Sequence, residues 1–375
     1  MKFLHTADWQ IGMKAAHVGE AGARVREERL AAAKRVVEAA RISGSYFVLI
    51  AGDTFEDNGV DRVLIQKVAD ILAGFGGPVY VIPGNHDPLV PGSVWEHPAW
   101  KSSANVRVLR EEQPVEISGG TLYPCPARAK WSGKDPTAWI ASQEGQGIRI
   151  GLAHGTVEGV QQDEPDYPIP QNAAVRAGID YLALGHWHST TLYPGPNGTT
   201  QMAYSGTHET TKFGERDSGN ALIIEIAALG TPAVITPVPT GGLSWIVVEE
   251  ELRLPGDLAR VRERIGAIQN PASTLVELRI FGLIGAEDRD EVARLREILA
   301  SRFLWNRVEA SRLRPAPGDE NWLASLPAGV LRESGARLRD LADPAYAGRR
   351  PEGATPEVAA RALLELYAHL GEAAP

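Results

Sequence analysis

The sequence has little cysteine and no long apolar run. Its single cysteine, Cys125, excludes an internal disulfide. No stretch approaches the ~20 apolar residues of a membrane-spanning helix, and the apolar run after Met1 is too short for a secretory signal. Positive charge is also scarce, with 38 Lys and Arg against 47 Asp and Glu and a net charge of −9. We therefore expect a cytoplasmic protein in which only a local patch or bound cations could meet a polyanion.

Apolar material is ample, because 43% of the 375 residues are hydrophobic. That length and content allow one large domain and one or two smaller ones. Up to residue 242, short aliphatic runs alternate with polar turns and helical stretches, which predicts an α/β fold with strands buried on both faces. The expected strands are 2–6, 46–51, 79–83, 148–153 and 181–184, and the expected helices are 25–41 and 60–74.

The pattern changes after residue 242. Residues 243–314 alternate strand-like and helix-like segments and predict a compact βαβαβ unit, whose last strand would be 306–312. Residues 315–375 are rich in Ala, Leu, Arg and Glu and predict a helical tail with a final helix at about 358–370.

Polar side chains follow all five expected strands of the first domain. They are Asp8, Asp53, Asn85 with His86 and Asp87, His154, and His186 with His188. Taken singly, such residues are more often turn formers or packed histidines. Five successive strands that all end in such residues indicate a ligand site, because α/β folds bind their ligands beyond the carboxyl ends of the strands. Carboxylate, amide and imidazole donors without thiolate favour Mn²⁺, Fe or Zn²⁺, and we expect Mn²⁺.

The motifs "ADWQIG", "AGDTFED", "PGNHD", "AHG" and "GHWH", followed by "AYSGT", resemble those of the calcineurin-like metallophosphoesterases in the same order. Within that superfamily they resemble the SbcD-like DNA repair nucleases. The resemblance spans roughly the first 240 residues. It implies a four-layer αββα sandwich over residues 1–242, with 243–314 as a capping domain that holds DNA. It also implies Mn²⁺-dependent hydrolysis of DNA phosphodiesters. Two roles stay open for the final helix of the tail, which could grip an SbcC-type ATPase or another repair protein, or could fold back to seal the cap. Relatives are often homodimers, so a homodimer is a further possibility.

The same resemblance implies roles for single residues. Asp53 would bridge two divalent metal ions. One ion would also be coordinated by Asp8, the residue at position 10 and His188. The other would also be coordinated by Asn85, His154 and His186. His86 would donate a proton or hydrogen bond to the leaving oxygen. Asp87, Glu56 or Asp57 would orient its imidazole.

Position 10 departs from the family pattern, because Gln10 stands where relatives have histidine. Alternation along an extended chain would place Gln10 on the side of Asp8 and point Trp9 away. An amide oxygen is a weaker and harder donor than imidazole. We therefore expect an active enzyme that holds its first metal less tightly and prefers Mn²⁺ to Zn²⁺.

Two other functions stay open on the sequence alone. One is a phosphodiesterase or phosphatase for small molecules such as cyclic nucleotides, and the other is a non-catalytic repair scaffold with a degenerate metal site.

Several residues also have simpler explanations. We expect His5, Trp9 and Trp187 to pack in the core, and His208 either to pack or to touch substrate. Lys14, His17, Arg24 and Arg26 could meet a phosphate backbone or form a solvated helix face.

Overall fold

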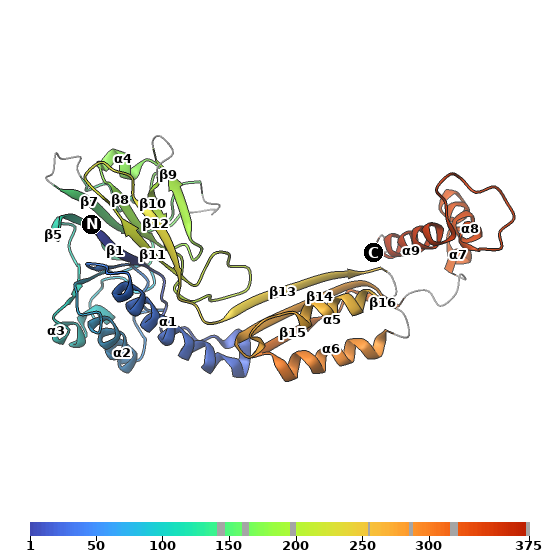
Figure 1. The fold of residues 1–375 in the computed structure, drawn as a ribbon, viewed down its shortest axis with the longest axis horizontal. Coiled ribbons are helices and arrows are strands. Elements are labelled where there is room, and N and C mark those ends of the chain that lie inside the picture. Colours follow the sequence, from blue (N-terminus) through green and yellow to red (C-terminus); the bar gives the residue numbers. More distant parts are fainter. Residues whose placement is uncertain are drawn as a thin grey trace. The chain divides into compact units, whose positions relative to one another are not determined.

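The structure is a computed structural model that describes residues 1–140, 147–159, 165–195, 200–253, 256–284, 288–315 and 322–372 (Figure 1). The chain divides into two compact units, Met1–Ser244 and Trp245–Pro375. A further division of the second unit into a capping domain and a tail stays a prediction. No described helix is both long enough and apolar enough to span a membrane.

Two six-stranded sheets form the first unit. The first has the order β12-β11-β1-β2-β3-β4, in which β1 to β4 are parallel and β11 pairs antiparallel with both β1 and β12. Its strands are β1 (Lys2–Thr6), β2 (Val48–Ala51), β3 (Val79–Ile82), β4 (Val106–Val108), β11 (Asn220–Glu225) and β12 (Val234–Pro239). The second has the order β5-β6-β7-β8-β10-β9, with antiparallel strands only at its two edges. Its strands are β5 (Val115–Ile117), β6 (Gly120–Cys125), β7 (Ile148–His154), β8 (Tyr181–Gly185), β9 (Thr191–Pro194) and β10 (Thr200–Tyr204).

Alternation along the strands produces the layers. In β1, Phe3 faces a core between the two sheets, whereas Leu4 faces a second core against helices. That second core packs α1 (Gly22–Ile42) and α2 (Arg62–Ala73) on the first sheet. A third core packs α4 (Ala173–Ala177) on the outer face of the second sheet. The predicted four-layer αββα sandwich is therefore confirmed.

The two main helices begin and end close to the expected residues. α2 begins at Arg62 because the Asp61 side chain accepts a hydrogen bond from the backbone N–H of Val63 at 2.8 Å. Shorter helical turns complete the unit: η1 (Ala16–Ala21), η2 (Val94–Glu96) and α3 (Ala99–Ser102). All five predicted strands are confirmed as β1, β2, β3, β7 and β8, and the other described strands of this unit carried no signal that we recognised.

The second unit contains the predicted βαβαβ order, followed by helices. Its elements are β13 (Ser244–Leu252), α5 (Asp257–Gly266), η4 (Pro271–Ser273), β14 (Thr274–Ile284), α6 (Arg289–Arg302), β15 (Trp305–Glu309), β16 (Leu313–Pro315), α7 (Trp322–Ser325), α8 (Val330–Ala342) and α9 (Pro356–Glu372). The last strand expected at 306–312 is present as β15, which ends at Glu309, and a further short strand, β16, also pairs with β14. Residues 316–321 and 373–375 of the predicted tail lie outside the described residues.

Candidate metal centre

The predicted ligands lie at the carboxyl ends of neighbouring strands. β1, β2 and β3 are adjacent in the first sheet, and β7 and β8 are adjacent in the second. The structure therefore brings together residues that are up to 178 positions apart in the chain, such as Asp8 and His186. The backbone N–H of His186 donates to both carboxylate oxygens of Asp8, at 2.9 and 3.1 Å. One carboxylate thus joins the strand ends of the two sheets.

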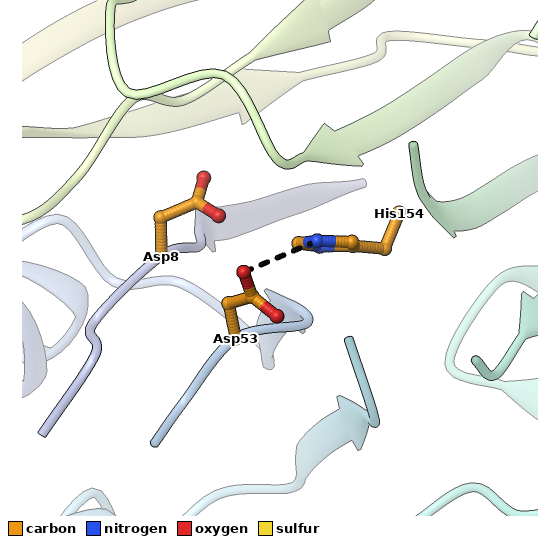
Figure 2. Close-up of side chains that lie close together, drawn as sticks. All are labelled: Asp8, Asp53 and His154. Atoms are coloured by element: carbon orange, nitrogen blue, oxygen red, sulfur yellow. Dashed lines mark ion pairs between the residues drawn. The ribbon is translucent and has the colours of Figure 1, made fainter. Parts of the chain in front are cut away.

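Asp8, Asp53 and His154 form the centre of the cluster (Figure 2). Each offers a ligand atom, and these atoms all lie within 4.8 Å of one another. The Nε2 atom of His154 lies 3.4 Å from Oδ2 of Asp53 and 2.8 Å from Oδ1 of Asn85. The same Asn85 oxygen lies 3.3 Å from Nδ1 of His186. Carboxylate, amide and imidazole donors therefore converge, as the sequence predicted.

A backbone contact orients the His154 ring. Its Nδ1 atom lies 2.8 Å from the carbonyl oxygen of Ala51, which can only accept a hydrogen bond. Nδ1 therefore carries the proton, and Nε2 is the ligand atom in the neutral ring. This is the arrangement that a metal-binding histidine requires.

The backbone takes a left-handed conformation at four of the predicted ligands. The φ angles are 54° at Asp8, 41° at Gln10, 49° at Asp53 and 110° at His186. Such values are uncommon outside glycine and concentrate at functional sites. The extended chain ends at Thr6, so strand alternation does not apply at Asp8 and Gln10 and cannot place the Gln10 side chain. Gln10 is 7% exposed, and its role as a ligand stays a prediction.

Gly84 lets two of the turns approach closely. A Cβ atom there would lie 2.1 Å from Oδ1 of Asp53, so no larger residue fits without moving that carboxylate. The same Asp53 oxygen accepts the backbone N–H of His86 at 2.9 Å. Asp87 accepts the N–H groups of Phe55 and Gly84, at 2.9 and 2.7 Å. Asp87 therefore fixes the backbone of both turns.

His86 is positioned by a backbone group. Its Nδ1 atom lies 3.0 Å from the carbonyl oxygen of Glu56. Of the three candidates for orienting this ring, the structure places the main chain of Glu56 against it, while the Asp87 carboxylate faces backbone amides. Nδ1 then carries a proton, and Nε2 is the nitrogen left for a substrate.

Burial and charge set the ionisation of the cluster. Burial raises the pKa of Asp8 to about 6. Burial also acts to raise the pKa of Asp53, but the charge and hydrogen bond of His154 outweigh it and lower this pKa to about 2. Burial acts to lower the pKa of His154, yet the two carboxylates raise it to about 9. At neutral pH two buried carboxylates face one imidazolium, and a divalent cation that displaces this proton fits the donor set.

Sequence reasoning missed two residues that support the site. Glu215 lies 2.7 Å from Nδ1 of His188, through its Oε1 atom. The buried guanidinium of Arg29 donates to the carbonyl oxygens of Asp8 and Trp9, at 3.3 and 2.9 Å. Neither residue follows a strand or belongs to a recognised motif, so the sequence carries no local signal for them.

The expected core residues pack as predicted. The His5 ring lies between the hydroxyl of Tyr181 at 2.9 Å and the carbonyl oxygen of Leu184 at 3.1 Å. Trp9 is buried and stacks on His208, with ring centroids 5.0 Å apart. His208 is fully buried, so of its two expected roles the structure supports packing. Trp187 packs partly buried against the outer core of the second sheet.

The charged residues after the first motif contact the protein itself. Arg24 pairs with Glu28 at 2.8 Å, and Arg26 donates to the carbonyl oxygen of Lys14 at 2.8 Å. These contacts fit a solvated helix face.

A family comparison agrees with this geometry. The family model of calcineurin-like phosphoesterases matches residues 1–190, which include all the predicted ligands. The chain belongs to the calcineurin-like phosphoesterase family. This family hydrolyses phosphoesters with bound metal, and Asp8, Asp53 and His154 are candidate ligands for a metal in this calcineurin-like phosphoesterase.

Among curated proteins, this calcineurin-like phosphoesterase is similar to the uncharacterized metallophosphoesterase YhaO of Bacillus subtilis (strain 168). The two are 28% identical over 218 residues, or 52% of each chain. The chain thus spans about half the length of this curated relative. Among solved structures, TT1561 of Thermus thermophilus is 11% identical and covers 64% of this chain and 98% of its own, with a TM-score of 0.42. A second solved chain is also 11% identical, covers 63% and 98%, and has a TM-score of 0.41.

Proposed function

We propose that this phosphoesterase is a DNA nuclease that uses two divalent cations, with Mn²⁺ preferred. The observation that carries the proposal is the convergence of Asp8, Asp53, Asn85, His154 and His186 donors at one edge of the sandwich. DNA as substrate is supported by the resemblance of "HTADWQ" and "YSGT" to the SbcD-like nucleases. It is also supported by a second unit, Trp245–Pro375, which a small substrate would not need.

The ligand sets are those that the family resemblance implies, and the grouping of Asp8, Asp53 and His154 supports them. Asp8, Gln10 and His188 would hold one cation, and Asn85, His154 and His186 the other, with Asp53 shared between them. Bound cations neutralise phosphate charge and lower the pKa of an attacking water. All of these donors are oxygen or imidazole, and the amide at position 10 favours Mn²⁺ over Zn²⁺.

His86 would assist departure of the sugar oxygen. The Glu56 carbonyl oxygen accepts the Nδ1 proton, so the ring would act as an imidazolium that gives its Nε2 proton to the leaving oxygen and becomes neutral. An alkoxide is a poor leaving group, so this proton lowers the barrier to bond cleavage. Asp87 acts indirectly, because it fixes the turn on which His86 lies. The SbcC-type partner and the second copy of the chain stay predictions.

A cleavage assay tests the proposal. The full chain is incubated with Mn²⁺, Mg²⁺ or Zn²⁺ and end-labelled single-stranded, duplex and hairpin DNA, beside a chromogenic phosphodiester. We expect DNA cleavage that is strongest in Mn²⁺ and that Asp53→Ala and His86→Ala abolish. Glu225→Gln is the matched control, because the Glu225 side chain forms a surface ion pair with Lys2 at 3.1 Å.

The outcomes separate the three functions. Cleavage of the small ester without cleavage of any DNA would overturn the DNA assignment and favour a small-molecule phosphodiesterase. Absence of metal-dependent hydrolysis on every substrate would favour a scaffold.

A further inference from the structure

We propose that a binding site for an unpaired nucleobase lies beside the metal centre, in a cavity formed by residues 126–139 and Tyr167. It would accept the base of a nucleotide next to the scissile phosphate of single-stranded DNA. This inference rests on the proposed nuclease function and names the form of substrate that the site would take.

The cavity has the size of a ligand pocket. Its volume is about 530 Å³, within the range of typical small-molecule sites. Its walls include Arg128, Trp131, Lys134, Trp139 and Tyr167. Aromatic and basic side chains are therefore mixed along one wall, as in sites that bind single-stranded nucleic acid.

Two contacts join this cavity to the metal centre. The first is a backbone bridge, in which Ala127 donates to the carbonyl oxygen of Pro83 at 3.0 Å and accepts from Leu89 at 2.9 Å. Pro83 and Leu89 flank the turn that carries Asn85 and His86. The start of the cavity wall is thus tied to a turn of the metal centre.

The second contact runs through Tyr167. A Cβ atom at Gly155 would lie 2.2 Å from the carbonyl oxygen of Tyr167, so this residue packs directly on the neighbour of His154. The Tyr167 hydroxyl accepts the N–H groups of Arg128 and Ala129, at 3.2 and 3.1 Å, and donates to the carbonyl oxygen of Ala129 at 2.9 Å. Tyr167 therefore links the cavity wall to the strand end that carries His154.

Trp131 is suited to stacking on a base. Its side chain is 58% exposed, although burying an indole would be favourable. The ring lies over Gly133, where a Cβ atom would come 3.2 Å from its Cη2 atom. An exposed ring held over its own turn offers a free face, and every base has a face that can stack on it.

The charge of this segment also favours a polyanion. Arg128, Lys130 and Lys134 lie within seven residues of one another in a chain with a net charge of −9. One acid of the cavity wall, Asp135, is neutralised by Arg176 at 2.7 Å. Glu112 is the other acid of the wall, while Arg128 pairs with the neighbouring Glu111 at 2.9 Å. Lys130 and Lys134 form no ion pair with another described residue, so they are the basic groups that would meet a DNA phosphate.

Such a site selects single strands. In a duplex the base faces are stacked and unavailable to an indole. We therefore expect cleavage of single-stranded or frayed DNA in preference to intact duplex.

The test combines a protein variant with a substrate variant. Oligonucleotides carry one abasic position, moved stepwise across the cleavage site, and KM is measured for the wild-type chain and Trp131→Ala. We expect one abasic position to raise the wild-type KM by about 5- to 150-fold, the range of base–aromatic stacking. In Trp131→Ala the KM for intact DNA should rise by a similar factor, and the abasic position should add nothing further.

Tyr46→Ala is the matched control. Tyr46 is also 58% exposed, but it precedes β2 and so lies at the opposite ends of the parallel strands. We expect this variant to keep the wild-type abasic profile, and Trp131→Phe to restore part of the affinity for DNA. If DNA is cleaved and Trp131→Ala shows the wild-type abasic profile, this inference alone is overturned. If the wild-type chain hydrolyses only the small ester and binds no oligonucleotide in fluorescence anisotropy, both proposals fail.

Discussion

The Nδ1 atom of His188 lies 2.7 Å from the Oε1 atom of Glu215. Because a carboxylate accepts this hydrogen bond, the ring presents Nε2 as its free ligand atom. The other Glu215 oxygen accepts the N–H of Thr211 at 2.7 Å, which fixes the carboxylate. A carboxylate that accepts the Nδ1 proton makes the other ring nitrogen, Nε2, a stronger ligand for a cation. Glu215 would therefore offset the weaker amide donor that Gln10 would bring to the same cation.

Replacement of Glu215 by glutamine should weaken metal binding. We expect Glu215→Gln to lower the Mn²⁺ affinity by about 10- to 100-fold, the usual effect of removing such a partner. The measurement is calorimetric titration of chelator-treated protein with Mn²⁺. Glu225→Gln serves again as the control, and equal affinities in the two variants would show that Glu215 does not act through His188.

Gln10→His should strengthen one of the two proposed metal sites. Histidine tolerates the left-handed backbone at this position, where φ is 41°. We expect about tenfold tighter binding of one Mn²⁺ and a shift of preference toward Zn²⁺, since imidazole is the softer donor. Competition with a chromophoric chelator measures both effects. If neither changes, the side chain at position 10 does not ligate metal.

Gly84→Ala should disrupt the centre through packing alone. The added Cβ atom would lie 2.1 Å from Oδ1 of Asp53, so the carboxylate must move. We expect the rate of metal-dependent hydrolysis to fall by at least about 100-fold, which is the usual effect of misplacing a catalytic group. We also expect weaker Mn²⁺ binding. The control is Gly266→Ala, where nothing lies within 4 Å of the new atom. Wild-type Mn²⁺ affinity in Gly84→Ala would contradict the close packing of this turn.

His5 should make the stability of the metal-free protein depend on pH. Burial lowers its pKa to about 3, so the folded ring stays neutral where the unfolded ring, with a pKa of 6.5, binds a proton. The contribution of neutral His5 to the free energy of unfolding is fully present above pH 6.5. It is lost as the pH falls toward 3, by about 1.4 kcal/mol per pH unit. His5→Gln can still donate to Leu184 and accept from Tyr181. Urea unfolding between pH 4 and 6.5 should show a shallower slope in this variant, and identical slopes would refute the assignment.

The sequence by itself determined the features of this protein that arise between residues close together in the chain. Strand periodicity and turn residues are local properties, so β1, β2, β3, β7 and β8 and the polar residues after them could be predicted. The other described strands of the first unit could not be predicted, because a strand such as β9 or β12 is defined by the strand it pairs with.

Only the tertiary structure decided how the site is held together. Glu215 meets His188 across 27 positions, and Arg29 meets Asp8 across 21, so neither pair leaves a pattern in the chain. The left-handed turns at Asp8 and Asp53 likewise exist because packing and hydrogen bonds between the strand ends outweigh local preference. The donor types are written in the sequence, and their geometry follows from contacts that form only when the two sheets pack face to face.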